Sequence, residues 1–158
     1  MIFGYRMEAI SILAGEVMLP RGLIGLGLDS IDYCGKEIAQ AMDIFANPAR
    51  YPIMSHCTQG KDRTGLLVAL LLLLLDVPIE AITYDYTLSE TELEPEMEAR
   101  LAEIREINLS EEFAKTPKEW IPKMKEHLDE KYGGINKYLK SIGVDEAKQQ
   151  RIVDILEA

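Results

Sequence analysis

Residues 51–75 constrain the fold of this chain more than any other segment. A short apolar stretch, Tyr51-Pro-Ile-Met-Ser55, leads into the decapeptide His-Cys-Thr-Gln-Gly-Lys-Asp-Arg-Thr-Gly at 56–65, and the apolar run Leu66–Leu75 follows. This order predicts a strand at about 51–56, then a tight loop and a helix over 64–75. In such a unit the backbone N–H groups of the loop and of the helix N-terminus converge and favour a bound anion.

The decapeptide also carries residues that can react with a bound anion. Cys57 precedes Arg63 by six positions. A thiol near a helix N-terminus and a cation is shifted towards thiolate, and a planar guanidinium matches two phosphate oxygens. The pattern therefore predicts an activated sulfur nucleophile facing a phosphate. The alternatives are a buried cysteine in an ordinary loop and a purely structural helical protein, which would leave the decapeptide unexplained.

The decapeptide resembles the signature loop of the cysteine-based protein tyrosine phosphatases. Its inner Gly-Lys-Asp-Arg-Thr-Gly is similar to that of a bacterial and fungal branch with tyrosine, dual-specificity and phosphoinositide phosphatase activity. Weaker similarity extends from about residue 36 to the C-terminus, through Tyr84-Asp85-Tyr86 and residues 131–143. The resemblance implies an α/β phosphatase-like fold and metal-independent hydrolysis of phosphate monoesters through a phosphocysteine intermediate.

Members of this branch carry several strands upstream of the loop, and no comparable segment precedes residue 50 here. We therefore expect a single phosphatase-like domain over residues 1–158 that corresponds to the C-terminal portion of a longer domain. It should be predominantly helical, with one clear strand at about 51–56. A lone buried strand leaves backbone groups unpaired. Either Met1–Tyr5, a missing piece of the domain or a second chain therefore pairs with it, or the segment is extended coil covered by helices.

The resemblance implies a role for each residue of the loop. Cys57 is expected to attack phosphorus, and Arg63 to bind two phosphate oxygens. The Thr64 hydroxyl should stabilise the sulfur as a leaving group, and His56 should orient the loop. Backbone N–H groups from Thr58 to Arg63 should hold the oxygens, with glycine at position 60 for close approach. The expected substrate-binding residues are Thr58, Gln59, Gly60, Lys61, Thr64 and His56.

The general acid has more than one candidate. The branch is thought to place it inside the loop, at Asp62, although the neighbouring Lys61 and Arg63 predict a lowered pKa for this carboxyl. Asp29 and Asp32 are the upstream alternatives, and helix capping explains them as well. Lys61 is expected either as a second cation over the pocket mouth, suited to substrates with several phosphates, or as a solvated loop lysine.

Composition limits the remaining possibilities. A formal net charge of −10 argues against nucleic-acid binding and against adsorption to anionic membranes. The ten apolar residues of Leu66–Leu75 are too few to span a bilayer and predict a buried central helix, so no stable membrane insertion is expected. With two cysteines, a reducing, cytoplasmic setting is expected, and Cys34 is either a redox partner of Cys57 or a small buried side chain.

Two other functions compete with an active phosphatase. The chain could be a catalytically inactive phosphate-binding fragment or a partner-dependent module, because the upstream strands are missing. Sulfur transfer and arsenate reduction use similar cysteine loops, but Thr64 directly after Arg63 favours phosphatase chemistry. We expect no metal or cofactor, and a phosphorylated protein or a phosphoinositide as substrate; the oligomeric state stays open.

Helical periodicity and breakers predict the rest of the chain. Residues 19–28 are expected to be loop, and Asp145 is expected to cap the last helix. An acidic segment, 90–106, should form a solvated helix face in its second half. The expected helices are Met7–Val17, 30–46, 79–87, a stripe through 97–107, 117–131, 135–141 and 145–157.

Overall fold

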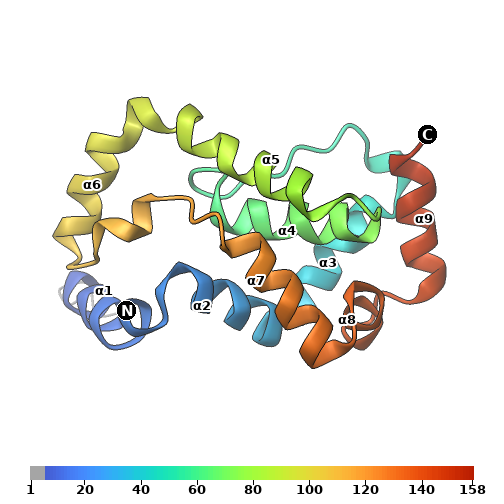
Figure 1. The fold of residues 1–158 in the computed structure, drawn as a ribbon, viewed down its shortest axis with the longest axis horizontal. Helices are drawn as coiled ribbons and strands as arrows, with labels where there is room; N and C mark the ends of the chain where they lie inside the picture. The colour runs from blue at the N-terminus through green and yellow to red at the C-terminus, as the bar shows by residue number, and fades with distance from the viewer. Residues whose placement is uncertain (1–5) are drawn as a thin grey trace.

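The computed structural model describes residues 6–158, and every regular element in that range is helical (Figure 1). Short 3₁₀ or π-helical turns join the longer helices. The α-helices are α1 Arg6–Leu13, α2 Leu19–Tyr33, α3 Gly35–Phe45, α4 Asp62–Leu74, α5 Ile79–Glu92, α6 Met97–Glu106, α7 Trp120–His127, α8 Ile135–Ser141 and α9 Glu146–Leu156. The short turns are η1 Ala14–Met18, η2 Pro48–Arg50, η3 Glu94–Glu96, η4 Glu111–Ala114 and η5 Leu128–Tyr132.

Helix α4 occupies the middle of the molecule and contacts α2, α5 and α8 (Figure 1). Its sequence is apolar on nearly all sides, and such a helix is stable only when neighbours cover it. The predicted buried central helix is therefore confirmed. Its fully or largely buried side chains are Leu66, Ala69, Leu70, Leu71 and Leu74.

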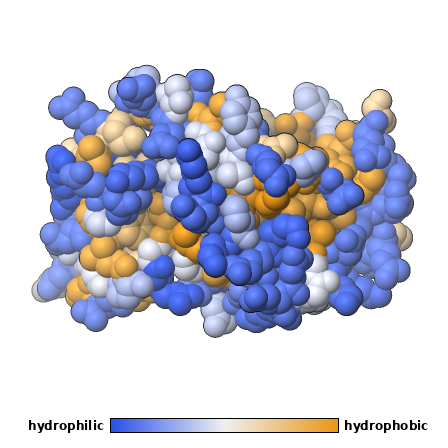
Figure 2. All heavy atoms as spheres, viewed as in Figure 1, coloured by the Kyte–Doolittle hydropathy of each residue, from blue (hydrophilic) through white to orange (hydrophobic). Residues whose placement is uncertain are grey.

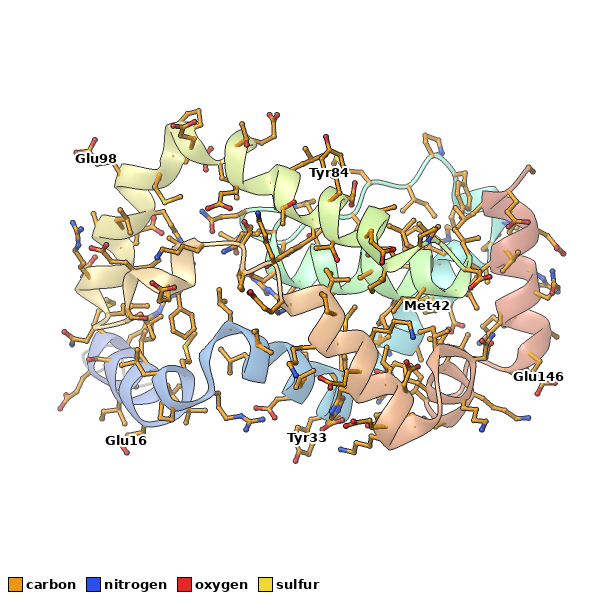
Figure 3. The ribbon with its side chains drawn as sticks, in the orientation of Figure 1. Glu16, Tyr33, Met42, Tyr84, Glu98 and Glu146 are labelled. Atoms are coloured by element: carbon orange, nitrogen blue, oxygen red, sulfur yellow. The ribbon has the colours of Figure 1, made fainter. Side chains whose placement is uncertain are left out.

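The buried apolar residues form two clusters. The main cluster surrounds α4 and includes Met42, which is fully buried and points inward in Figure 3, whereas Tyr33 and Tyr84 point to solvent. The small cluster lies between the N-terminal helices, α6 and η4; its buried members are Ala14, Ile104, Leu109, Phe113 and Ala114. In Figure 2, apolar side chains appear at this end between surrounding hydrophilic residues.

The strand expected at 51–56 is not formed. Residues 51–57 run without regular structure from η2 to the loop, and successive side chains alternate between partly buried and exposed, as in an extended chain. A strand needs a neighbour that accepts and donates its backbone hydrogen bonds. No segment within 6–158 supplies one, and Met1–Tyr5 lies outside the described residues. The chain is therefore predominantly helical, and an α/β sheet is absent from residues 6–158.

The prediction of a loop at 19–28 was wrong. These residues belong to α2, which tolerates Gly22 in a non-helical conformation (φ 63°, ψ 176°) as a kink. Glycine adopts a positive φ at little steric cost, so the helix resumes after it. The partly buried Ile24 and Leu28 then pack against the main cluster, which explains why tertiary contacts overrode the glycine-rich composition.

The helix expected over 30–46 is divided. Helix α2 ends at Tyr33, and Cys34 (φ −105°, ψ 27°) separates it from α3. Cys34 is exposed, so its prediction as a buried side chain was wrong. The later helices follow the predicted order with shifted ends. Asp145 caps α9 as expected, because its carboxylate accepts the Lys148 N–H at 2.8 Å.

One helical stretch, Arg6–Tyr33, has the length and composition of a membrane span, with 28 residues and a mean hydropathy of 1.5 in its best window. This is weak support for insertion, because signal sequences and core helices of soluble proteins share these properties. The stretch bends at Gly22, and its α2 half contacts α4 and α7. The absence of stable membrane insertion stays a prediction.

Candidate active site

The decapeptide forms a loop that ends in the first turn of α4. The helix begins at Asp62, two residues before the predicted start, and the Gly65 N–H donates to the Lys61 carbonyl at 2.7 Å. Gly60 has φ 70°, a conformation that residues with a Cβ rarely adopt. Gly65 is required for another reason: a Cβ there would lie 2.9 Å from Cδ2 of Tyr86. Both glycines of the motif thus have a steric explanation.

Cys57 lies in the loop with its thiol half-buried. Burial alone would raise the pKa of this thiol, but the Thr64 hydroxyl and the backbone N–H groups of Thr64, Gln59 and Gly60 stabilise the thiolate. Together they lower the pKa of Cys57 to about 6, from an ordinary value of 9.0. Thr64 Oγ1 is buried and has no other hydrogen-bond partner within residues 6–158, so its hydroxyl is free to serve the Cys57 sulfur.

Arg63 and His56 flank the cysteine. The Arg63 Nη2 donates to Thr58 Oγ1 at 3.1 Å, so the guanidinium reaches back from α4 across the loop. His56 Nδ1 lies 2.9 Å from the Cys57 carbonyl oxygen, a contact between ring and backbone. The structure thus brings Cys57, Thr58 and Arg63 together at one site. The substrate-binding and catalytic roles of these residues stay predictions.

The pKa of Asp62 is shifted in the direction opposite to the one expected from its charged neighbours. Burial, which disfavours the charged carboxylate, raises the pKa of Asp62 above its ordinary value. The opposing effects of Lys61, Arg100 and Tyr86 are smaller. Lys61 Nζ lies 3.5 Å from Asp62 Oδ1, and the Tyr86 hydroxyl donates to the same oxygen at 3.4 Å. The predicted lowered pKa was therefore wrong, and the carboxyl is suited to hold a proton.

Lys61 does not lie over the pocket mouth. Its side chain is only 1% exposed, and Nζ donates to the carbonyl oxygens of Lys115 at 2.6 Å and Phe113 at 3.3 Å. Burial lowers the pKa of Lys61, against the attraction of Asp62. Both alternatives from the sequence, a cation for a second phosphate and a solvated lysine, are wrong. Lys61 instead links the loop to the segment around η4.

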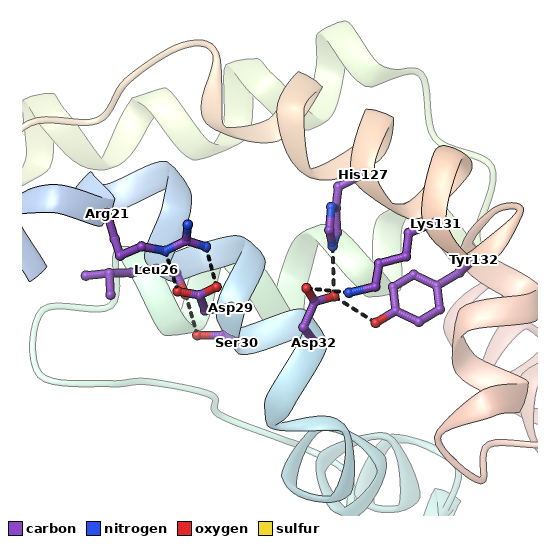
Figure 4. A network of polar contacts seen from close by, with 8 residues as sticks. All are labelled: Arg21, Leu26, Asp29, Ser30, Asp32, His127, Lys131 and Tyr132. Carbon is purple, nitrogen blue, oxygen red and sulfur yellow. Dashed lines mark hydrogen bonds and ion pairs between the residues drawn. The ribbon is translucent and has the colours of Figure 1, made fainter. Parts of the chain in front are cut away.

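The two upstream carboxylates are engaged away from the loop (Figure 4). Asp29 forms an ion pair with Arg21. Asp32 accepts from the Tyr132 hydroxyl at 2.7 Å and pairs with Lys131 at 2.7 Å and His127 at 2.8 Å. These contacts join α2 to α7 and η5. Each carboxylate thus has a structural explanation.

Two side chains at the site escaped the sequence-based prediction of function. Tyr86 belongs to the Tyr84-Asp85-Tyr86 segment noted above, but nothing in the sequence placed its hydroxyl beside Asp62. Arg100 lies on α6, within the acidic segment 90–106. Its positive charge lowers the pKa of both Lys61 and Asp62. Neither contact follows from spacing, because 24 positions separate Tyr86 from Asp62 and α6 comes later still.

The geometry defines a class of site. A cysteine whose thiolate is stabilised by backbone N–H groups, an arginine across the loop and a carboxyl with a raised pKa lie close together. This is the arrangement expected of a loop that binds an anion beside a sulfur nucleophile and a proton donor. No group of three or more His, Cys, Asp or Glu side chains in residues 6–158 is arranged to hold a metal ion.

Comparison with known proteins agrees with this class. Residues 26–158 match the tyrosine phosphatase family, and the chain belongs to that family. It is 28% identical over 121 residues to the triple specificity protein phosphatase PtpB of Mycobacterium tuberculosis, covering 66% of this chain and 44% of that protein. It is 30% identical over 139 residues to a tyrosine-protein phosphatase of Nostoc commune, covering 80% and 47% respectively. The chain thus spans slightly less than half the length of these curated relatives.

Proposed function

We propose that this protein hydrolyses phosphate monoesters without a metal ion, with Cys57 as the nucleophile. The observation that carries the proposal is the position of Cys57 in the loop, where the backbone N–H groups of Gln59, Gly60 and Thr64 stabilise its thiolate and lower its pKa to about 6. A thiolate is the reactive form of cysteine, and a loop that stabilises one negative charge also favours a phosphate.

In the first step, the Cys57 sulfur attacks phosphorus while the bond to the leaving oxygen breaks. The guanidinium of Arg63 and the loop N–H groups stabilise the charge on the three equatorial oxygens. Asp62, whose pKa is raised above its ordinary value by burial, donates its proton to the leaving oxygen. The products are an alcohol or phenol and a phosphocysteine.

In the second step, water attacks the phosphocysteine and the phosphorus–sulfur bond breaks. The Asp62 carboxylate left by the first step accepts a proton from this water, so inorganic phosphate and the original protonation state are regenerated. The Thr64 hydroxyl, next to Cys57 and without another partner, stabilises the departing thiolate. His56 orients the loop through its contact with the Cys57 carbonyl.

Phosphotyrosine is the substrate we propose first, with phosphoserine, phosphothreonine or phosphoinositide as further substrates. Family membership and the names of the relatives support phosphorylated substrates in general. Because Lys61 is buried, recognition of several phosphates through this lysine is not part of the proposal. A cytoplasmic location is proposed as well, since a thiolate nucleophile needs a reducing environment.

The test is phosphate release from 4-nitrophenyl phosphate by the chain, with a chelator present, compared with Cys57→Ser. Cys34→Ser is the matched control, because Cys34 is exposed and lies outside the loop. We expect turnover in the wild type and in Cys34→Ser, and none in Cys57→Ser. A folded wild-type chain no faster than Cys57→Ser would refute the proposal and favour an inactive phosphate-binding module.

A further inference from the structure

A cavity of about 370 Å³ lies beside the loop, where the two apolar clusters meet. Its walls are mainly apolar and include Leu26 from α2, Leu66 from α4, Phe113 from η4 and Trp120 from α7. A space of this size accommodates an aryl group. Cys57 does not line it, but Asp62 and Arg63 do, so the cavity and the loop share a border.

Arg100 lines the cavity and has a hydrogen-bond donor without a partner. Its Nη1 donates to Glu103 Oε2 at 3.2 Å on the outer side of α6. Its Nε is buried and has no hydrogen-bond partner. A buried donor without an acceptor is costly, and one on a guanidinium is satisfied best by an anionic oxygen. The Arg100 side chain also lines the cavity, so a ligand there could provide an oxygen to its guanidinium.

The position of Asp62 connects the cavity to the reaction. If Asp62 protonates the leaving oxygen, the leaving group must begin beside this carboxyl. From there the leaving group can extend into the cavity that Asp62 borders, towards Arg100. The phosphate would then lie on the loop side of Arg63, whose Nη2 already reaches Thr58.

We propose that this cavity is the leaving-group subsite, and that it selects phosphate monoesters with an apolar, aryl-sized body and a second anionic group bound by Arg100. The inference deepens the proposed function and rests on it for the position of the phosphate. It assigns Arg100 as a specificity-determining residue. It also gives an anionic acceptor to the Arg100 guanidinium, whose Nε is buried without a hydrogen-bond partner.

The test compares naphthyl phosphate with a carboxynaphthyl phosphate as ligands of the Cys57→Ser variant, which binds without turnover. Calorimetry gives the two dissociation constants. Trp120 is the only tryptophan of the chain and borders the cavity, so its emission reports occupancy. We expect the carboxylated ligand to bind at least about tenfold more tightly, as for a hydrogen bond between charged groups. Both ligands should change the Trp120 emission.

Adding Arg100→Gln should make the two dissociation constants about equal, because the amide cannot replace the charged donor. Arg105→Gln is the matched control: it lies on the same helix, is exposed and pairs with Glu111 outside the cavity. The control should keep the preference.

Three results would overturn the inference. They are equal affinity for the two ligands in Cys57→Ser, a preference that survives Arg100→Gln, or saturation without a change in Trp120 emission. If Arg100→Gln does not fold, the ligand preference and the Trp120 signal of Cys57→Ser still decide. Binding here is independent of turnover, so absence of phosphate release by the wild type would refute the proposed function without producing any of these three results.

Discussion

Cys57 and Asp62 have pKa values shifted in opposite directions within one loop. Hydrogen bonding to the thiolate outweighs burial at Cys57, whereas burial dominates at Asp62. These shifts favour the charged form of the proposed nucleophile and the protonated form of the proposed acid. Pairs of groups whose environments move their pKa values apart identify the base or nucleophile and the acid of a site.

These two shifts predict a bell-shaped pH profile of kcat/KM for an aryl phosphate. Activity should fall below about pH 6, because protonated Cys57 does not attack. It should also fall on the basic side, as Asp62 loses the proton held by its raised pKa. Asp62→Asn should lower kcat by about 10²- to 10⁴-fold and remove the basic limb while keeping the acidic one. A basic limb that persists in Asp62→Asn would assign the acid to another group.

At the scale of elements, Lys61 joins the start of α4 to η4. Its ammonium group donates to two carbonyl oxygens 52 and 54 positions away in the chain. A buried lysine is costly unless it is hydrogen-bonded and paired, and here Asp62 supplies the pair. Lys61 is therefore a positioning residue for the loop and an electrostatic partner of the proposed acid.

Lys61→Met should destabilise the chain by about 2 kcal/mol, because two carbonyl groups lose their donor. It should also shift the basic limb of the pH profile to higher pH. The positive charge of Lys61 lowers the pKa of Asp62, so its removal lets that pKa rise further. Thermal unfolding and the pH dependence of kcat/KM measure the two effects. A basic limb that stays in place would mean that Asp62 does not titrate in it.

Asp32 performs a similar task between α2 and the α7–η5 segment. Its side chain is 12% exposed. Burial raises the pKa of Asp32, but hydrogen bonds from Lys131, His127 and Tyr132 prevail and lower it from 3.8 to about 2. Because the folded-state pKa is the lower one, this stabilisation is complete above about pH 4 and is lost as the pH falls towards 2.

Asp32→Asn should therefore lower the free energy of unfolding by about 1 kcal/mol at pH 7, allowing for solvent screening of the exposed Lys131 partner. Most of the difference from the wild type should be lost at pH 2, because Asp32 is then largely protonated in the unfolded chain and half protonated in the folded one. Asp29→Asn is the control, since its exposed ion pair with Arg21 should contribute nothing measurable. Urea unfolding at both pH values gives the comparison. An undiminished difference at pH 2 would mean that the carboxylate charge is not responsible.

At the scale of the whole molecule, stability is unevenly distributed. The main cluster surrounds α4 and includes side chains of α3, α5, α7, α8 and α9, whereas the small cluster relies on a few residues between α6, η4 and the N-terminal helices. Several apolar side chains of the N-terminal helices are more than one third exposed, among them Ile12, Leu13 and Val17. The end of the molecule that contains Arg100 is thus the less well buried one.

Hydrogen exchange should follow this division. Amides of α4 should exchange only through global unfolding, while those of α1 and α6 should exchange through local opening at a lower free energy. The aryl phosphate ligands should increase protection in α6, because the cavity borders both clusters. Equal protection of α4 and α6 in the free protein would show a single cooperative core instead.

The sequence predicted several elements because their signals are local. The ten-residue apolar run at 66–75 is stable only as a buried helix. The Asp145 cap joins residues that are only three positions apart. The prediction of a loop at 19–28 was wrong. A high glycine content shows only that the backbone can adopt many conformations, whereas the packing of Ile24 and Leu28 decides whether a helix forms. The prediction of a strand at 51–56 was wrong because a strand forms only when a second segment pairs with its backbone. The relation of the chain to a longer domain stays a prediction.

The candidate site also has features that the sequence predicts and features that depend on tertiary contacts. The sequence by itself determined which residues lie in the loop, and family membership agrees with that motif, because Cys57, Arg63 and the glycines act over a few positions of one chain segment. Only the tertiary structure decided the direction of the pKa shift of Asp62, the burial of Lys61 and the presence of Arg100 beside a cavity. Desolvation and charge act through space, so they depend on α2, α6, η4 and α7, whose positions no local pattern specifies.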